Sequence, residues 1–159
     1  MPEPQETVIH CTQAIRDLWP DPLASQWLAQ YPDLFDEHDL RLAGTQPAYH
    51  FCEWFAAIHI FQRDGALSLV EKYVYPSHAR KVALLDERLG SSAHATLDAI
   101  CARLHVQPPD LFVYGTESGR YWFAEVKGPG DRFSEQQLAS HQAITAELGV
   151  PVEVVRVVL

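Results

Sequence analysis

Two acidic residues, Asp110 and Glu125, flank two runs of strand-forming residues, at positions 111–114 and 121–123. A five-residue loop with a glycine at each end, residues 115–119, separates the runs and predicts an antiparallel hairpin. Paired positions in such a hairpin have residue numbers with a constant sum, which a loop centred on residues 117 and 118 sets at about 235. Asp110 and Glu125 are therefore expected to face each other at the open end of the hairpin.

Opposed side chains in a sheet have Cβ atoms about 5 Å apart, and two like charges at that separation destabilise the pairing. A divalent cation between the carboxylates would remove the repulsion, and Mg²⁺ is typically held by one or two carboxylates. Strand alternation places Lys127 on the face of Glu125, while Val126 points into the core and leaves its carbonyl near the site. These groups suit metal-assisted hydrolysis of a phosphodiester, with two carboxylate ligands, one carbonyl and a catalytic lysine.

Residues 125–137 read EVKGPGDRFSEQQ, and a Pro-Asp pair ends at Asp110. This combination resembles the VRR-NUC family of the PD-(D/E)XK nuclease superfamily, closely so over about residues 109–156. The resemblance implies a Mg²⁺- or Mn²⁺-dependent deoxyribonuclease that cuts branched or flap DNA and serves DNA repair. It also implies that Asp110, Glu125 and Lys127 are catalytic, with the two acids and the Val126 carbonyl as metal ligands.

Residues 48–61 are hydrophobic nearly all round, which predicts a buried helix. The single acid in it is Glu53, and a buried carboxylate requires a compensating cation or hydrogen-bond donor. In the superfamily that the chain resembles, the helix before the first strand supplies an acid to the metal site. The resemblance thus implies that Glu53 is catalytic and completes the metal shell through water. An exposed glutamate on a narrow polar edge is the alternative interpretation, and Glu71 is the other candidate acid.

The residues from Ser134 to Gln137 form a capping-box pattern at the start of a helix predicted over residues 134–148. Gln137 has two interpretations. It satisfies a backbone N–H in the capping box, or it is the site glutamine that the family resemblance implies. Arg132 likewise either holds a phosphate or pairs with Glu135.

The remaining elements are predicted from periodicity and from turn residues. They are helices at 6–19 and 23–31, a polar connector at 32–39, a strand at 67–75, helices at 79–89 and 93–105, and a last strand at 150–159. The cationic cluster at 76–81 is interpreted either as a solvated helix start or as a phosphate clamp.

This order of elements predicts an α/β fold. It resembles the restriction-endonuclease-like αβββαβ core, with a mixed central sheet. We expect an N-terminal helical extension at residues 1–45 and a VRR-NUC-like nuclease domain at residues 46–159. A helical insertion at about residues 77–106 precedes the catalytic hairpin.

The composition agrees with a single core and excludes some functions. The chain has 159 residues, is 47% hydrophobic and carries a formal net charge of −9, which argues against a general nucleic-acid coat protein. No apolar run reaches the roughly 18 residues of a membrane span, so we expect a cytoplasmic protein with no membrane partner. The family resemblance implies DNA as its partner. A homodimer is among the forms that we expect. The three cysteines lack metal-binding spacing and are interpreted as reduced core residues.

An alternative function is a catalytically inactive module that keeps the nuclease fold and binds DNA or a partner protein. Asp110, Glu125 and Lys127 are all present, whereas a degraded site usually loses one of them. The complete set favours the enzyme.

Overall fold

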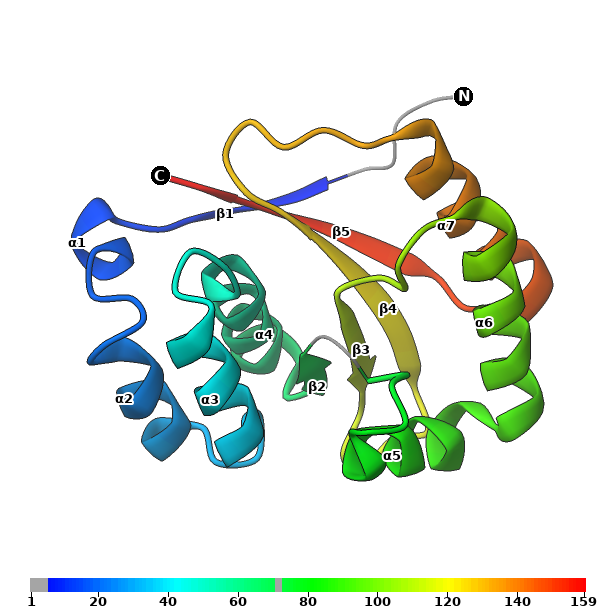
Figure 1. Ribbon diagram of the computed structural model, residues 1–159, viewed down its shortest axis with the longest axis horizontal. Coiled ribbons are helices and arrows are strands. Elements are labelled where there is room, and N and C mark those ends of the chain that lie inside the picture. The colour runs from blue at the N-terminus through cyan, green and yellow to red at the C-terminus, as the bar shows by residue number, and fades with distance from the viewer. Residues whose placement is uncertain (1–5, 71–72) are drawn as a thin grey trace.

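A five-stranded mixed sheet forms the centre of the computed structural model, which describes residues 6–70 and 73–159 (Figure 1). The strands lie in the order β1-β5-β4-β3-β2. β1 (Glu6–His10) and β4 (Tyr121–Lys127) run parallel to β5 (Val152–Val158). β3 (Leu111–Tyr114) pairs antiparallel with both β4 and β2 (Leu67–Val70).

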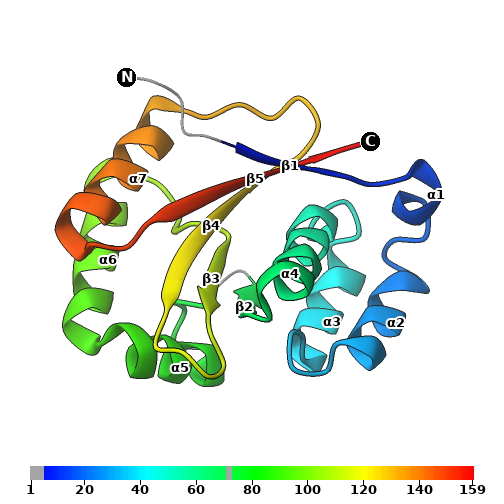
Figure 2. The same cartoon turned by 180° about the vertical axis from the view of Figure 1, so that it is seen from behind.

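Helices cover both faces of this sheet, as the two opposite views show (Figures 1 and 2). One side carries α2 (Leu23–Gln30), α3 (Glu37–Thr45) and α4 (Phe51–Asp64). The other side carries α6 (Ser91–Leu104) and α7 (Glu135–Leu148). The short α1 (Gln13–Arg16) follows β1, and α5 (Ala79–Leu89) precedes α6.

The order α4, β2, β3, β4, α7, β5 is the αβββαβ order predicted from the sequence. The helices α5 and α6 lie between β2 and β3, where the helical insertion was expected. The α/β prediction with a mixed sheet and a restriction-endonuclease-like core is therefore confirmed.

The helix α4 packs against β2, β4 and β5, which explains its apolar composition. Six of its residues are buried, and Gly65 ends it in the left-handed conformation at φ 69°. Glu53 lies in its first turn, at the end nearer the loop after β4, and shares a cavity with Gly128. None of the helices within residues 6–70 and 73–159 has the length and hydropathy that a membrane crossing requires.

The helix predicted over residues 6–19 is wrong for its first part. Residues 6–10 form the edge strand β1, and only Gln13–Arg16 is helical. Thr7, Val8 and Ile9 are β-branched, which favours a strand, and the parallel ladder with β5 satisfies their backbone groups. The helical periodicity was misleading because the partner strand lies near the other end of the sequence.

Two further boundaries differ from the prediction. The polar connector at 32–39 ends in a helix, because Asp36 caps α3 in a capping box with Asp39. The strand predicted over 67–75 ends at Val70, and Tyr73 already lies in a turn. Residues 71–72 of that prediction, including Glu71, lie outside the described residues.

Candidate active site at the open end of the hairpin

The register of the β3–β4 hairpin agrees with the one predicted from its loop. Leu111 pairs with Ala124 and Tyr114 with Tyr121, so the residue numbers of each pair add to 235. One further step in this register brings Asp110 opposite Glu125. The carboxylate of Asp110 accepts a hydrogen bond from the Val126 N–H at 2.8 Å, which ties it to β4.

Glu125 is almost completely buried, at 7% exposure. One carboxylate oxygen lies 3.9 Å from the Lys127 Nζ, and the other lies 3.6 Å from Nε2 of His141. Burial raises the pKa of Glu125, although the Lys127 charge and hydrogen bonding with Asp110 act in the opposite direction. Glu125 thus lies in a site largely removed from water, in contact with Lys127 and His141.

Lys127 extends from the end of β4 towards the start of α7. It is 6% exposed, and its Nζ donates to Oε1 of Gln137 at 3.1 Å and contacts the Arg132 carbonyl at 3.4 Å. The ammonium also lies 4.7 Å from the ring centroid of Phe133, a cation–π contact. These contacts fix the lysine beside Glu125 by means of three residues from the loop and helix that follow β4.

Gln137 makes the capping contact and also contacts Lys127, while its role as a site glutamine stays a prediction. The capping box with Ser134 is complete in both directions. The same Oε1 atom that accepts from the Ser134 N–H also accepts from Lys127. The helix cap thus places an amide oxygen against the lysine of the site.

His141 belongs to the site but was not identified from the sequence. Burial and the Lys127 charge lower the pKa of His141 to about 4, so the imidazole is neutral at pH 7. Its contact with Glu125 is therefore not an ion pair, and its buried Nδ1 has no hydrogen-bond partner among the described residues. Its position four residues after Gln137, on the same helix face, was the available signal.

Glu53 faces a cavity of about 350 Å³ that Val126 and Asp131 also line. Burial, with Glu53 and Asp131 nearby, raises the pKa of the Cys52 thiol in this cavity to about 11. The acid on α4 and the residue following Glu125 on β4 thus border one space. The metal role of Glu53 stays a prediction, and Glu71, the other candidate, lies outside the described residues.

A cationic side chain that the sequence did not indicate also lines this cavity. Arg16 of α1 lines it, with its guanidinium 4.6 Å from the ring centroid of Phe51. The sequence placed Arg16 within a long amphipathic helix, whereas the chain turns after β1 and Arg16 lines the same cavity as Glu53.

The loop after β4 is held in place by Arg156 of β5. Its Nη1 donates to the carbonyls of Gly128 and Asp131, at 3.1 and 2.9 Å, and its guanidinium pairs with Glu6 of β1. Gly128 in turn donates its N–H to the Asp131 carboxylate at 2.8 Å. The edge strand β1 thus stabilises the loop that follows Lys127.

The groups at the open end of the hairpin fit a hard divalent cation. The carboxylates of Asp110 and Glu125 and the carbonyl of Val126 are oxygen donors, which Mg²⁺ and Mn²⁺ prefer. Burial is the main cause of the raised pKa of Glu125, and a bound cation would lower that pKa because it favours the charged carboxylate.

A second group of possible metal ligands lies on and before α3. One ligand atom each from Asp36, His38 and Asp39 lies within 4.8 Å of the others. Both acids already have cationic partners, since Asp36 pairs with Arg80 and Asp39 with Lys81. The phosphate-clamp interpretation of residues 76–81 loses its support, because these two cations hold α5 to α3. Lys81, at 2% exposure, is also not part of a solvated helix start.

Residues 58–159 match the family model of the VRR-NUC domain, which covers more than half of the chain. The chain belongs to the VRR-NUC family. The match contains β2 to β5 and therefore every residue of the hairpin site, while Glu53 lies just before it. No curated protein matches the chain. Membership of the VRR-NUC family suggests a nuclease-type function.

Proposed function

We propose that this VRR-NUC protein is a Mg²⁺- or Mn²⁺-dependent deoxyribonuclease that hydrolyses phosphodiester bonds, with a preference for branched or flap DNA. The observation that carries the proposal is the hairpin register, which sets Asp110 opposite Glu125 and leaves Lys127 on the same strand 3.9 Å from Glu125. Family membership supports the reaction class.

In this proposal, Asp110 and Glu125 bind the cation together with the Val126 carbonyl, and Glu53 contacts it through water. The bound cation would supply an activated water and would neutralise charge that develops on the phosphate. Lys127 stabilises the same developing charge from the protein side. Gln137 holds the lysine in position, since its Oε1 lies 3.1 Å from the Lys127 Nζ.

Cleavage of labelled DNA tests the proposal directly. Branched, flapped and linear DNA would each be incubated with Mg²⁺, with Mn²⁺ or with EDTA. We expect cleavage that requires the metal and is faster on the branched or flapped substrates. DNA binding without cleavage under any metal condition would instead favour the inactive module.

The role of Glu53 requires a separate test. Glu53→Gln is expected to reduce the cleavage rate severely with little change in Tm, because the side chain would act only through the metal site. Glu37→Gln is the matched control, since Glu37 also lies in the first turn of a helix but is exposed on α3. If both variants cleave within a few-fold of the unaltered protein, Glu53 has no metal role.

A further inference from the structure

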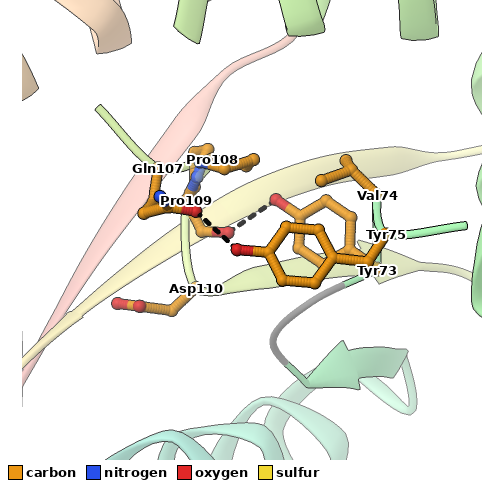
Figure 3. A pocket seen from close by; sticks show the side chains of 7 residues that line it. All are labelled: Tyr73, Val74, Tyr75, Gln107, Pro108, Pro109 and Asp110. Carbon is orange, nitrogen blue, oxygen red and sulfur yellow. Dashed lines mark hydrogen bonds between the residues drawn. The ribbon is translucent and has the colours of Figure 1, made fainter. Parts of the chain in front are cut away.

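A cleft of about 240 Å³ opens beside Asp110, between the turn after β2 and the segment that leads into β3. Its walls come from the turn after β2, which contributes Tyr73, Val74 and Tyr75, and from residues 107–109 (Figure 3). Asp110 borders it with its carboxylate directed away from the two tyrosine rings (Figure 3). The cleft therefore adjoins one residue proposed to hold the metal, Asp110.

The inner wall of the cleft is fixed by Tyr73. This side chain is buried, its ring stacks on Phe123 of β4 with centroids 6.2 Å apart, and its hydroxyl donates to the Pro109 carbonyl at 2.5 Å. Because Pro109 immediately precedes Asp110, the position of the cleft is tied to the position of the carboxylate.

The outer wall presents an accessible aromatic ring. Tyr75 is 38% exposed, and its hydroxyl donates to Oε1 of Gln107 at 3.0 Å across the cleft (Figure 3). With Oε1 engaged, the amide nitrogen of Gln107 keeps its two N–H donors available, with no partner recorded among residues 6–70 and 73–159. The cleft thus offers a ring face, apolar proline and valine surface, and an amide donor.

These features suit a flat, uncharged ring with hydrogen-bond acceptors on its edge. Within the described part of the chain, the residues that line the cleft are aromatic, apolar or amide-bearing, apart from Asp110. Nucleobases stack on aromatic side chains, and their edges accept hydrogen bonds from amides. The cleft is also smaller than the roughly 300–1,000 Å³ of pockets for drug-sized ligands, which agrees with a single ring system.

We propose that this cleft binds one unstacked nucleobase of the DNA strand next to the cleaved phosphodiester. The inference rests on the proposed nuclease function and specifies its substrate, because a base inside a continuous duplex is stacked on both faces and must be unstacked before it can enter. An unpaired nucleotide at a flap or branch enters without the cost of unstacking a duplex. The structural preference of the enzyme then originates in Tyr75 and Gln107.

The test is an abasic scan. A flap substrate would carry a single abasic nucleotide at each successive position around the cleaved bond, and kcat/KM would be measured for every position. We expect the unaltered protein to lose about tenfold at one position, within the roughly 5- to 150-fold range of base–aromatic stacking. Tyr75→Ala should lower kcat/KM on the intact substrate by a similar factor and should show no penalty at that position.

Two further variants distinguish stacking from general damage. Tyr75→Phe keeps the ring and should retain the abasic penalty. Tyr49→Ala removes another exposed tyrosine, which lines the cavity of Glu53 rather than this cleft, and should also retain it. A flat scan of the unaltered protein, or a penalty that persists in Tyr75→Ala, would overturn the proposal.

A binding measurement separates this inference from the proposed reaction. The abasic series would be repeated as fluorescence anisotropy with the Lys127→Ala variant in Mn²⁺, where no turnover is expected. If the chain does not cleave DNA but one abasic position weakens binding in a Tyr75-dependent way, the cleft assignment holds and the nuclease assignment fails. If the chain cleaves DNA but no abasic position changes binding or kcat/KM, the nuclease assignment holds and the cleft assignment fails.

Discussion

A buried ion pair joins α3 to α5, and its removal tests how the helical layer is held together. Lys81 and Asp39 are 2% and 3% exposed, and the Lys81 Nζ donates both to the Asp39 carboxylate at 2.5 Å and to the Val70 carbonyl at 2.8 Å. Lys81→Met keeps the apolar stem and removes the charge. It leaves the Asp39 carboxylate buried with no ammonium beside it.

Removing one partner of a buried pair typically costs about 3–5 kcal/mol of unfolding free energy. For a domain of this size, each kcal/mol lowers Tm by about 2–4 °C, so Lys81→Met should lower Tm by about 6–20 °C. Burial already raises the pKa of Asp39 against the opposing effect of Lys81. Without the lysine that pKa rises further, so the loss should be largest at neutral pH and should shrink as Asp39 becomes protonated at acidic pH.

Urea unfolding followed by tryptophan fluorescence would measure the loss. The matched control is Arg80→Met. Arg80 is next to Lys81 on α5 and pairs with Asp36, but its side chain is 54% exposed. An exposed pair contributes about 0–1 kcal/mol, so this control should change Tm by a few degrees at most. A loss below about 1 kcal/mol for Lys81→Met, or no recovery when Asp39→Leu is added, would refute the reasoning.

Three predictions concern the site itself. Lys127→Ala should abolish turnover while calorimetric Mn²⁺ affinity stays nearly unchanged, because the lysine acts on the transition state; loss of both would contradict that role. Asp110→Asn and Glu125→Gln should each abolish metal binding and activity. Each should nevertheless raise Tm in EDTA, because it removes one of two adjacent negative charges and burial already raises the pKa of Glu125. A lower Tm in EDTA for both would mean that the acids serve the fold. His141→Gln tests pH dependence: burial lowers the pKa of His141 from 6.5 to about 4, so its contribution to stability is complete above pH 6.5 and is lost as the pH falls towards 4. Urea unfolding in EDTA should show that the free energy of unfolding falls by about 3 kcal/mol more in the unaltered protein than in His141→Gln between about pH 7.5 and pH 4. The same dependence of this free energy on pH in both proteins would exclude the linkage.

The hairpin was predictable because its geometry is local. A short loop with glycines at both ends fixes the pairing of the two strands, and the register then follows from the residue numbers alone. The start of α7 was predictable for the same reason, since the capping box is complete within residues 134–137. Local rules thus locate Asp110, Glu125 and Lys127 without any knowledge of the remaining fold.

The contacts that were missed join positions far apart in the sequence. Residues 6–10 become a strand because β5 lies beside them, with Glu6 bonded to Arg156. Lys81 is buried because Asp39 lies opposite, on a helix that precedes β2. No local pattern specifies such partners, whereas the Asp36 capping box was visible in the sequence and shows that α3 could have been predicted.

The charge distribution limits how the protein can bind DNA. The chain has twelve lysines and arginines and a formal net charge of −9. Within the described residues, at least six of these cations form ion pairs with acids of the fold, namely Arg63, Arg80, Lys81, Arg103, Lys127 and Arg156. At most six of the twelve therefore remain unpaired for phosphate contacts. Affinity for DNA through phosphate neutralisation depends on many such contacts, so it should be low here.

Under the proposed function, binding would then come mainly from contacts at the open end of the hairpin. A cation held by Asp110 and Glu125 would attract one phosphate, and the cleft at Tyr75 would bind one base beside it. A continuous duplex offers the phosphate without the free base, whereas a flap or a branch offers both. Because many of its cations are paired with acids, the protein would bind any duplex weakly. The aromatic cleft would add affinity only where a nucleotide is unstacked. Both features therefore favour the same substrate, a flap or a branch.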